Sequence, residues 1–188
     1  MAERVKKTEA YGLARYFLLT MALSFIGWAY ETLFVFLQSG RWHDQGFMTM
    51  PFCPIYGCSL IGAYLLAGTP DEGRGLLKNV DNRILRYALY FLIAFAVPTI
   101  AELFVGLFFD KTFGIWLWSY RALPLNINGY ICLPVSLAWA ALIFAFMKWL
   151  FPPLKRLIYK IPLKVARGFA ILLFALVAVD FIYNFRKI

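Results

Sequence analysis

Two glutamates stand inside long apolar stretches of the sequence, and they are the residues best suited to chemistry. Glu31 follows the apolar run of residues 16–30, and Glu102 lies within residues 84–109. A charged side chain within a membrane-spanning helix costs roughly 2.5–3.5 kcal/mol on insertion scales, so it normally faces the interior of a helix bundle and finds a partner there. A carboxylate in such a place can bind a solute or serve as an acid or base. We therefore expect Glu31 and Glu102 to mark a functional site.

Prolines indicate where two helices begin near these glutamates. Pro51, Pro54 and Pro134 are predicted in the first turns of two helices, whose N-termini present unpaired N–H groups that attract carboxylates and other anions. Pro98, one turn before Glu102, can bend its helix toward the same interior. The pattern predicts an outward-facing polar pocket. Its candidate substrate-binding residues are Glu31, Glu102, Arg41, His43, Asp44, Tyr56, Trp118, Tyr120, Arg121, Asn126 and Asn128.

The same residues are also typical of simpler roles, and these alternatives stay open. The two carboxylates can serve only to cap and brace helices, and His43, the one histidine of the chain, is typical of a surface loop. Trp116, Trp118 and Tyr120 are typical of an aromatic belt at a membrane interface.

Composition shows which kind of fold must position these residues. Of 188 residues, 62% are hydrophobic and only 15% are charged, against roughly 25% charged in soluble domains. A helix needs about 20 apolar residues to span the hydrocarbon core, and several segments reach that length. The sequence therefore predicts an all-α membrane protein, one transmembrane domain over residues 1–188, with about five spanning helices and one basic segment in the membrane interface. The helices are expected at residues 15–38, 51–68, 84–109, 129–150 and 165–185, and the interfacial segment at 151–164.

Basic residues predict the orientation of these helices. With five spans, 14 of the 19 Lys and Arg residues fall on the side of the N-terminus and 5 on the other side. By the positive-inside rule, the N-terminus is cytoplasmic and the C-terminus lies outside. The net charge of +9 is explained by this topology and by attraction to anionic lipid at the cytoplasmic face, worth about 1 kcal/mol per basic residue near the surface. Binding to nucleic acid is not needed to account for it.

The chain carries a weak internal repeat. Glu31 is followed by a loop with Arg41 and a helix start at residues 51–54, and Glu102 is followed by a loop with Arg121 and a helix start at residues 129–134. Because each copy has two spans, we expect a parallel repeat in which helices 1 and 2 superpose on helices 3 and 4.

Several catalytic and metal-binding patterns are missing from the sequence. There is no Gly-x-x-x-x-Gly-Lys-Ser/Thr phosphate loop, no Gly-x-Ser-x-Gly elbow and no His-Glu-x-x-His pair. The cysteines Cys53, Cys58 and Cys132 lack zinc spacing and are typical of small core residues, although a disulfide between Cys53 and Cys132 stays open. We therefore expect no metal, no cofactor and no ATPase activity of the chain's own, and the pattern favours a protein that is not an enzyme.

Residues 20–145 resemble a known family. The resemblance rests on Gly27-Trp28, Glu31, the segment Pro-Phe-Cys-Pro-Ile-Tyr-Gly at residues 51–57, Glu102 and residues 118–133. This pattern is similar to the ABC-transporter permease family of small bacterial membrane proteins labelled type IV or CmpB-like. The resemblance implies transport and a place in the bacterial cytoplasmic membrane.

The leading hypothesis is a permease-like subunit that binds a small polar or amphiphilic solute in the outward-facing pocket and is energised by a separate ATPase or an ion gradient. One alternative is a membrane enzyme acting on a lipid-linked substrate, with a glutamate as acid or base. The other is a non-catalytic accessory protein that packs the small residues Cys58, Ser59, Gly62 and Ala63 against a partner.

Overall fold

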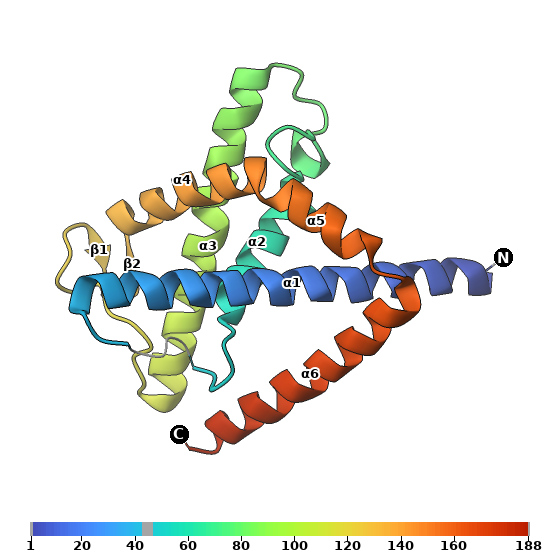
Figure 1. The fold of residues 1–188 in the computed structure, drawn as a ribbon. Helices are drawn as coiled ribbons and strands as arrows, with labels where there is room; N and C mark the ends of the chain where they lie inside the picture. Colours follow the sequence, from blue (N-terminus) through green and yellow to red (C-terminus); the bar gives the residue numbers. More distant parts are fainter. Residues whose placement is uncertain (1, 43–46, 188) are drawn as a thin grey trace. The chain divides into compact units, whose positions relative to one another are not determined.

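The structure is predominantly helical, with a single two-stranded hairpin among the described residues, which confirms the predicted all-α class. The computed structural model describes residues 2–42 and 47–187, with the side chains of residues 12–37, 39–42 and 47–187. The elements follow one another along the chain as shown in Figure 1. Their bounds are α1 Ala2–Ser39, α2 Pro54–Ala67, the 3₁₀ turn η1 Gly75–Leu77, α3 Arg83–Phe113, β1 Asn126–Ile127, β2 Ile131–Cys132, α4 Leu133–Trp149, α5 Phe151–Lys160 and α6 Leu163–Phe185.

Three of the described helices are long and apolar enough to cross a membrane. They are Gly12–Leu37 within α1, the whole of α3 and the whole of α6. The pair α4 and α5 passes the same test only if the two helices, bent against each other at Leu150, count as one span, which makes four. The helix α2 is apolar but has 14 residues, a length of about 21 Å at 1.5 Å per residue. The five expected helices therefore all have a counterpart, but α2 falls short of a full crossing.

The chain divides into two units, Met1–Gly57 with Pro153–Ile188, and Cys58–Pro152. In the first unit α1 packs against α6, where the rings of Phe17 and Phe174 meet edge to face with centroids 6.1 Å apart. Arg15 on α1 donates to the carbonyl oxygens of Tyr159 and Ile161 at 3.1 and 3.2 Å. These contacts fix the turn that leads into α6.

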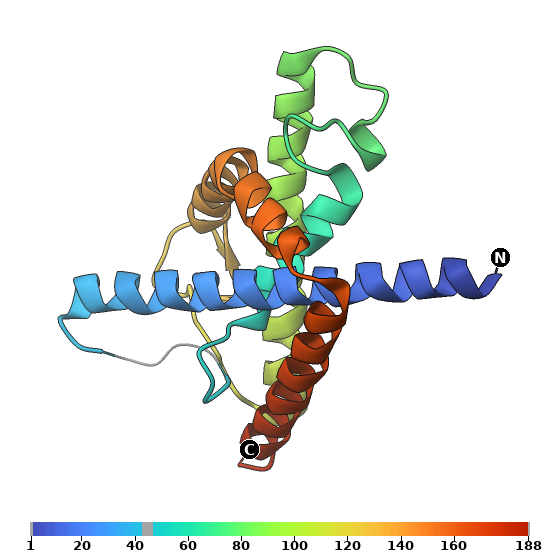
Figure 2. The same ribbon diagram turned by 45° about the vertical axis from the view of Figure 1, so that its right-hand side comes forward.

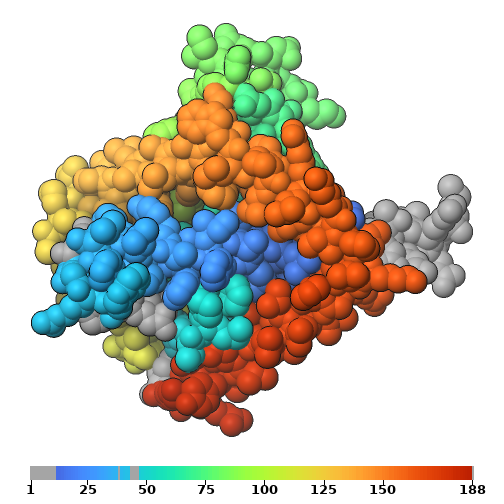
Figure 3. Space-filling model, in the orientation of Figure 1, coloured from blue at the N-terminus to red at the C-terminus, as the bar shows by residue number. Residues whose placement is uncertain are grey.

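Most of α6 is left uncovered within its unit, which suits contact with lipid. Its side chains of Phe169, Ile171, Leu172, Phe174 and Val179 are each more than half exposed. Figure 3 shows this C-terminal segment, in red, open on the face in view. Because a helix satisfies its backbone groups internally, such an apolar surface is stable in a bilayer.

In the second unit α3 and α4 form the main helix pair. The α3 helix begins where the side chain of Asn82 accepts hydrogen bonds from two first-turn amides, at 2.9 and 3.1 Å. The segment between α2 and α3, which includes η1, folds back beside this end of α3 (Figure 2). Buried Tyr64 of α2 packs on Phe151 with ring centroids 4.7 Å apart.

The start of the fourth predicted helix differs from the structure. Residues 129–132 belong to a short antiparallel hairpin in which Asn126 pairs with Cys132, and α4 begins only at Leu133. Asn126 Oδ1 accepts from the backbone N–H of Gly129 at 2.9 Å, and Asn128 has a φ of 51°, so the side chain and the left-handed backbone together favour a turn.

The predicted interfacial segment at 151–164 is largely the helix α5, which opens with Pro152 and Pro153 in its first turn. On α5 Phe151 and Ile158 are buried, whereas Arg156 and Lys160 are exposed. This is the two-sided pattern of a helix that lies along an interface.

Candidate functional site

Glu31 of α1 is held by two neutral donors from the start of α2. Its Oε2 accepts a hydrogen bond from the Tyr56 hydroxyl at 3.0 Å, and the Sγ of Cys53 lies 3.9 Å away as a weaker donor. The backbone N–H of Cys53 also donates to the carbonyl oxygen of Ser24 at 3.1 Å. The site therefore joins about two turns of α1, from Ser24 to Glu31, to the Pro-Phe-Cys-Pro-Ile-Tyr-Gly segment.

Two glycines permit this close approach. A Cβ at Gly27 of α1 would lie 2.5 Å from both Cβ and Cγ of Tyr56, closer than real Cβ contacts come. A Cβ at Gly57 would collide with Ser24 Oγ and the carbonyl oxygen of Thr20. Small residues at such contacts allow helices to pack backbone to backbone in a membrane. Because Gly27 and Gly57 have no side chains, residues 51–57 come close enough to α1 for Tyr56 to reach Glu31.

The Cys53 thiol is kept in its protonated form. Burial raises the pKa of Cys53 to about 12, and the charge of Glu31 and the hydrogen bond to it act in the same direction. The thiol is therefore a donor at neutral pH and is not a reactive thiolate.

Glu102 of α3 also accepts from a tyrosine, and that tyrosine comes from the following loop. The hydroxyl of Tyr120 lies 3.2 Å from Oε1 of Glu102. The backbone N–H of Tyr120 donates to the carbonyl oxygen of Gly129 at 2.9 Å, and Trp118 Nε1 donates to the carbonyl oxygen of Tyr130 at 2.9 Å. The β1–β2 hairpin thus fixes the loop that carries Tyr120.

A stacked ladder stands beside this loop. The guanidinium of Arg121 lies 4.2 Å from the ring centroid of Trp116, and Trp116 stacks on Tyr130 at 4.9 Å with an interplanar angle of 9°. The Tyr130 hydroxyl donates to Asp110 Oδ2 at 2.6 Å, and this bond raises the pKa of the Tyr130 phenol. Gly129 has a φ of 81°, and a Cβ there would lie 2.6 Å from Cγ of Arg121, so the ladder requires glycine at this turn.

The predicted site residues thus form two local groups. Glu31 meets Tyr56 in the first unit, and Glu102 meets Tyr120 in the second, with Trp118, Arg121 and Asn126 in the same loop and hairpin. Arg41 is exposed after α1, and Asn128 is exposed at the tip of the hairpin. His43 and Asp44 lie outside the described residues. A cavity shared by the two glutamates and the superposition of the two repeats both stay predictions.

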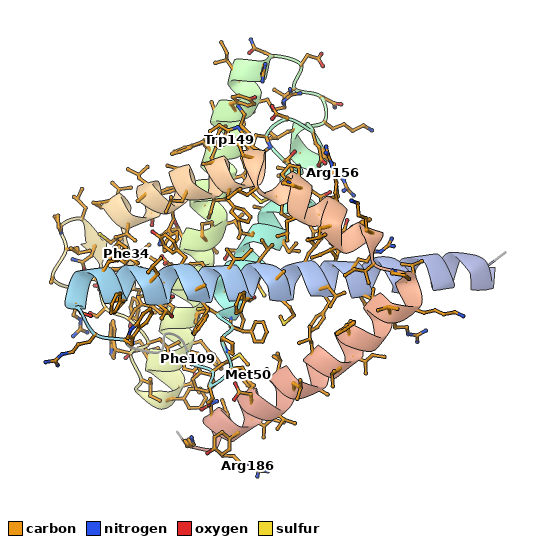
Figure 4. All side chains as sticks on the ribbon, in the orientation of Figure 1. Phe34, Met50, Phe109, Trp149, Arg156 and Arg186 are labelled. Atoms are coloured by element: carbon orange, nitrogen blue, oxygen red, sulfur yellow. The ribbon has the colours of Figure 1, made fainter. Side chains whose placement is uncertain are left out.

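One polar cluster was not singled out from the sequence. Asp180, inside the apolar run of α6, accepts from the backbone N–H of Met50 at 3.1 Å and from Asn184 Nδ2 at 3.2 Å. Thr49 completes the cluster with a 3.2 Å hydrogen bond to Asn184. Figure 4 labels Met50 on the loop beside α6 and Arg186 just beyond the end of that helix. The signal that marked Glu31, an acidic residue in a spanning helix, applies equally to Asp180.

Potential metal ligands do not gather in the described parts of the chain. Among the side chains that the structure describes, no three of His, Cys, Asp or Glu come together as a metal site would require. The three cysteines are free thiols in this structure.

Comparison with known proteins identifies the family. Residues 17–185 match the family described as "Putative ABC-transporter type IV". No curated protein and no solved structure matches the chain significantly. Because the match covers nearly the whole chain, and because the predicted resemblance pointed to the same group, the chain belongs to this family of ABC-transporter-type membrane proteins.

Proposed function

We propose that the chain is a permease-like subunit that binds a small polar or amphiphilic solute at its glutamate sites and is energised by a separate ATPase or an ion gradient. Membership of an ABC-transporter-type family supports a role in transport. The sequence contains no phosphate-binding loop, so hydrolysis of a nucleotide falls to another protein.

The observation that carries the proposal is the type of partner that holds Glu31. The carboxylate lies in a spanning helix, and its donors are a phenol and a thiol, both neutral. A hydrogen bond to a charged group contributes about 1.5–3 kcal/mol, whether the donor is the tyrosine or a solute. A solute with an N–H or O–H group can therefore replace the tyrosine as donor to Glu31 at small net cost. In the second unit Glu102 likewise accepts a hydrogen bond from a tyrosine, Tyr120.

The orientation of the chain supports a pocket that opens outward. The split of 14 basic residues against 5 favours a cytoplasmic N-terminus and an outer C-terminus in the bacterial cytoplasmic membrane, with α2 counted as a crossing. In that orientation Glu31 and Glu102 both lie in the outer halves of their helices. A reporter fused after Ile188 should be active only outside the cytoplasm, and cytoplasmic activity would refute this topology.

The decisive experiment pairs uptake with stability. Cells that produce the protein are screened for uptake of a labelled panel of amines, amino acids, sugars and carboxylates. The variants Glu31→Gln and Glu102→Gln are then compared with Asp81→Asn, a control that neutralises an exposed carboxylate just before α3. We expect the glutamine variants to lose uptake while their melting temperatures in detergent stay close to that of the wild type.

The opposite result assigns the glutamates to structure. If melting temperature and uptake fall together, in proportion to the folded protein that remains, the carboxylates only brace the helices and the proposal fails.

A further inference from the structure

The loop between α3 and α4, residues 114–132, is apolar for a segment that joins two helices. Arg121 is its only charged residue. Three of its apolar side chains, those of Leu123, Leu125 and Ile127, are 42%, 68% and 58% exposed. Exposed apolar side chains gathered in one segment mark a surface that meets a membrane or another protein. The loop therefore carries apolar surface that is open on the outside of the second unit.

Leu125 holds a backbone conformation that leucine rarely adopts. Its φ is 56°, in the left-handed region that glycine and asparagine enter far more readily. The N–H of Leu133 fixes this conformation by donating to the carbonyl oxygen of Leu125 at 3.1 Å. Because most of the Leu125 side chain is exposed, packing inside the chain compensates little of the strain. Contact with an apolar environment outside the chain would offset it.

Asp110 and Lys111 mark the level at which α3 leaves the hydrocarbon region. They follow residues 87–109, in which Glu102 is the only charged residue. At 1.5 Å per residue, that stretch of helix is about 35 Å long. A hydrocarbon core of about 30 Å takes up nearly all of it.

The loop turns back along α3 to a deeper level. The Tyr120 hydroxyl donates to Glu102, which precedes Asp110 by about 12 Å along the helix. The ring of Trp118 lies beside Gly106, where an added Cβ would approach its Cζ2 to 3.6 Å. Both contacts are on the hydrocarbon side of Asp110. Figures 1 and 2 show the β1–β2 hairpin alongside α3 and not beyond the C-terminal end of that helix.

A segment at this depth must supply partners for its own backbone groups, because the hydrocarbon region offers none. The Asn126 side chain donates to the carbonyl oxygen of Leu123 at 2.7 Å and accepts from the N–H of Gly129 at 2.9 Å. The Sγ of Cys132 donates to the carbonyl oxygen of Pro124 at 3.3 Å. The carbonyl oxygens that accept hydrogen bonds within residues 120–133 include those of Tyr120, Leu123, Pro124, Leu125, Ile127 and Gly129. The loop thus satisfies much of its backbone without water.

We propose that residues 121–128 insert into the leaflet at the C-terminal end of α3, where the side chains of Leu123, Leu125 and Ile127 contact lipid acyl chains. Arg121 is long enough to keep its guanidinium at the level of the headgroups. The insertion is independent of the transport proposal and of the side of the membrane on which this leaflet lies.

The test is the depth of spin labels on the full-length protein in vesicles of phosphatidylethanolamine and phosphatidylglycerol. Cys53, Cys58 and Cys132 are first replaced by serine, so that each protein carries one introduced cysteine. Leu125→Cys and Ile127→Cys place a nitroxide on the loop. Electron paramagnetic resonance then measures collisions of the label with oxygen, which enters the hydrocarbon region, and with a nickel chelate, which stays in water.

Two reference positions calibrate the measurement. Leu92→Cys lies within the apolar stretch of α3, where Leu92 is 59% exposed, and Asp81→Cys lies at an exposed position just before that helix. We expect the ratio of oxygen to nickel collisions at Leu125 and Ile127 to be close to that at Leu92 and well above that at Asp81.

A second variant tests the same inference without a label. Asparagine suits the left-handed backbone at position 125 better than leucine, so Leu125→Asn should raise the melting temperature if the side chain lies in water. If the side chain lies among acyl chains, burial of the amide outweighs that gain. We therefore expect Leu125→Asn to melt below the wild type in vesicles.

The contrary outcomes are distinct. A collision ratio like that at Asp81, or an unchanged or raised melting temperature of Leu125→Asn, would place the loop in water. Few collisions with either reagent would show that another part of the chain or a second copy covers the loop, which also overturns the proposal. If the label at Leu125 prevents folding, the label at Ile127 decides the question.

Discussion

Replacing Gly27 by alanine tests whether close packing of α1 on residues 53–57 positions the Glu31 site. The added Cβ would lie 2.5 Å from Cβ and Cγ of Tyr56, whereas real Cβ contacts stay beyond 3.0 Å. Tyr56 must therefore move by at least about 0.5 Å, and by about 1 Å to reach ordinary van der Waals contact. Because these atoms lie near the backbone, the ring cannot simply rotate away.

The displacement should also break the hydrogen bond to Glu31. The Tyr56 hydroxyl lies 3.0 Å from the carboxylate oxygen, and a shift of about 0.5–1 Å takes it to the limit of a hydrogen bond or beyond. Overpacking a tight contact costs about 1–3 kcal/mol. Alanine in place of glycine within a helix gains up to about 1 kcal/mol in propensity, which partly hides this cost.

The matched control is Gly12→Ala, because Gly12 lies on the same helix with nothing within 4 Å of an added Cβ. It receives the gain in propensity without the collision. We expect Gly27→Ala to be less stable than Gly12→Ala by about 1–3 kcal/mol, measured as reversible unfolding in mixed detergent micelles. Equal stability of the two variants would refute the packing argument.

Three further perturbations follow from the geometry. In a variant whose other two cysteines are replaced by serine, Cys53 should react with iodoacetamide at pH 8 far more slowly than in the unfolded protein, because a pKa of about 12 leaves roughly one thiolate in ten thousand. Adding Glu31→Gln should speed this reaction, and an unchanged rate would contradict the contact between Cys53 and Glu31. Asn82→Ala should lower stability by about 1 kcal/mol in thermal melts, because two first-turn amides of α3 lose their acceptor. An unchanged melting temperature would show that the Asn82 cap does not stabilise α3. Asp180→Ala should accelerate proteolytic cleavage at residues 47–50 in detergent, since the loop loses its bond to α6; wild-type cleavage kinetics would show that other contacts hold it.

The helical class and the main candidate residues follow from simple physical rules applied to the sequence. Long apolar runs predict helices, and the cost of a charge in lipid singles out Glu31 and Glu102. Both glutamates do have side-chain partners in the structure, Tyr56 and Tyr120. Tyr120 follows Glu102 by 18 residues, and its hydrogen bond to Glu102 depends on how the loop between them folds.

The remaining features depend on contacts that sequence patterns do not encode. The apolar residues 130–133 fit the start of a helix, but the side chain of Asn126 and the left-handed backbone at Asn128 turn them into a hairpin. Cys53 was expected to be a core residue or half of a disulfide, and its role as a donor to Glu31 appears only when α1 and the start of α2 meet. Two-residue strands and tertiary hydrogen bonds leave almost no periodic signal.

The short helix α2 has a consequence for the membrane around it. Its length of about 21 Å is some 9 Å less than a hydrocarbon core of about 30 Å. Hydrophobic mismatch of this kind costs fractions of a kcal/mol per ångström, and it is relieved when the bilayer thins locally. The residues that flank α2 are tied to the protein, because the N–H of Cys53 donates to the carbonyl oxygen of Ser24 and the N–H of Gly68 to that of Tyr64. The length of the lipid acyl chains should therefore affect α2, the helix that carries Tyr56. Short-chain lipids should accommodate α2 across the hydrocarbon core with the least deformation of the bilayer.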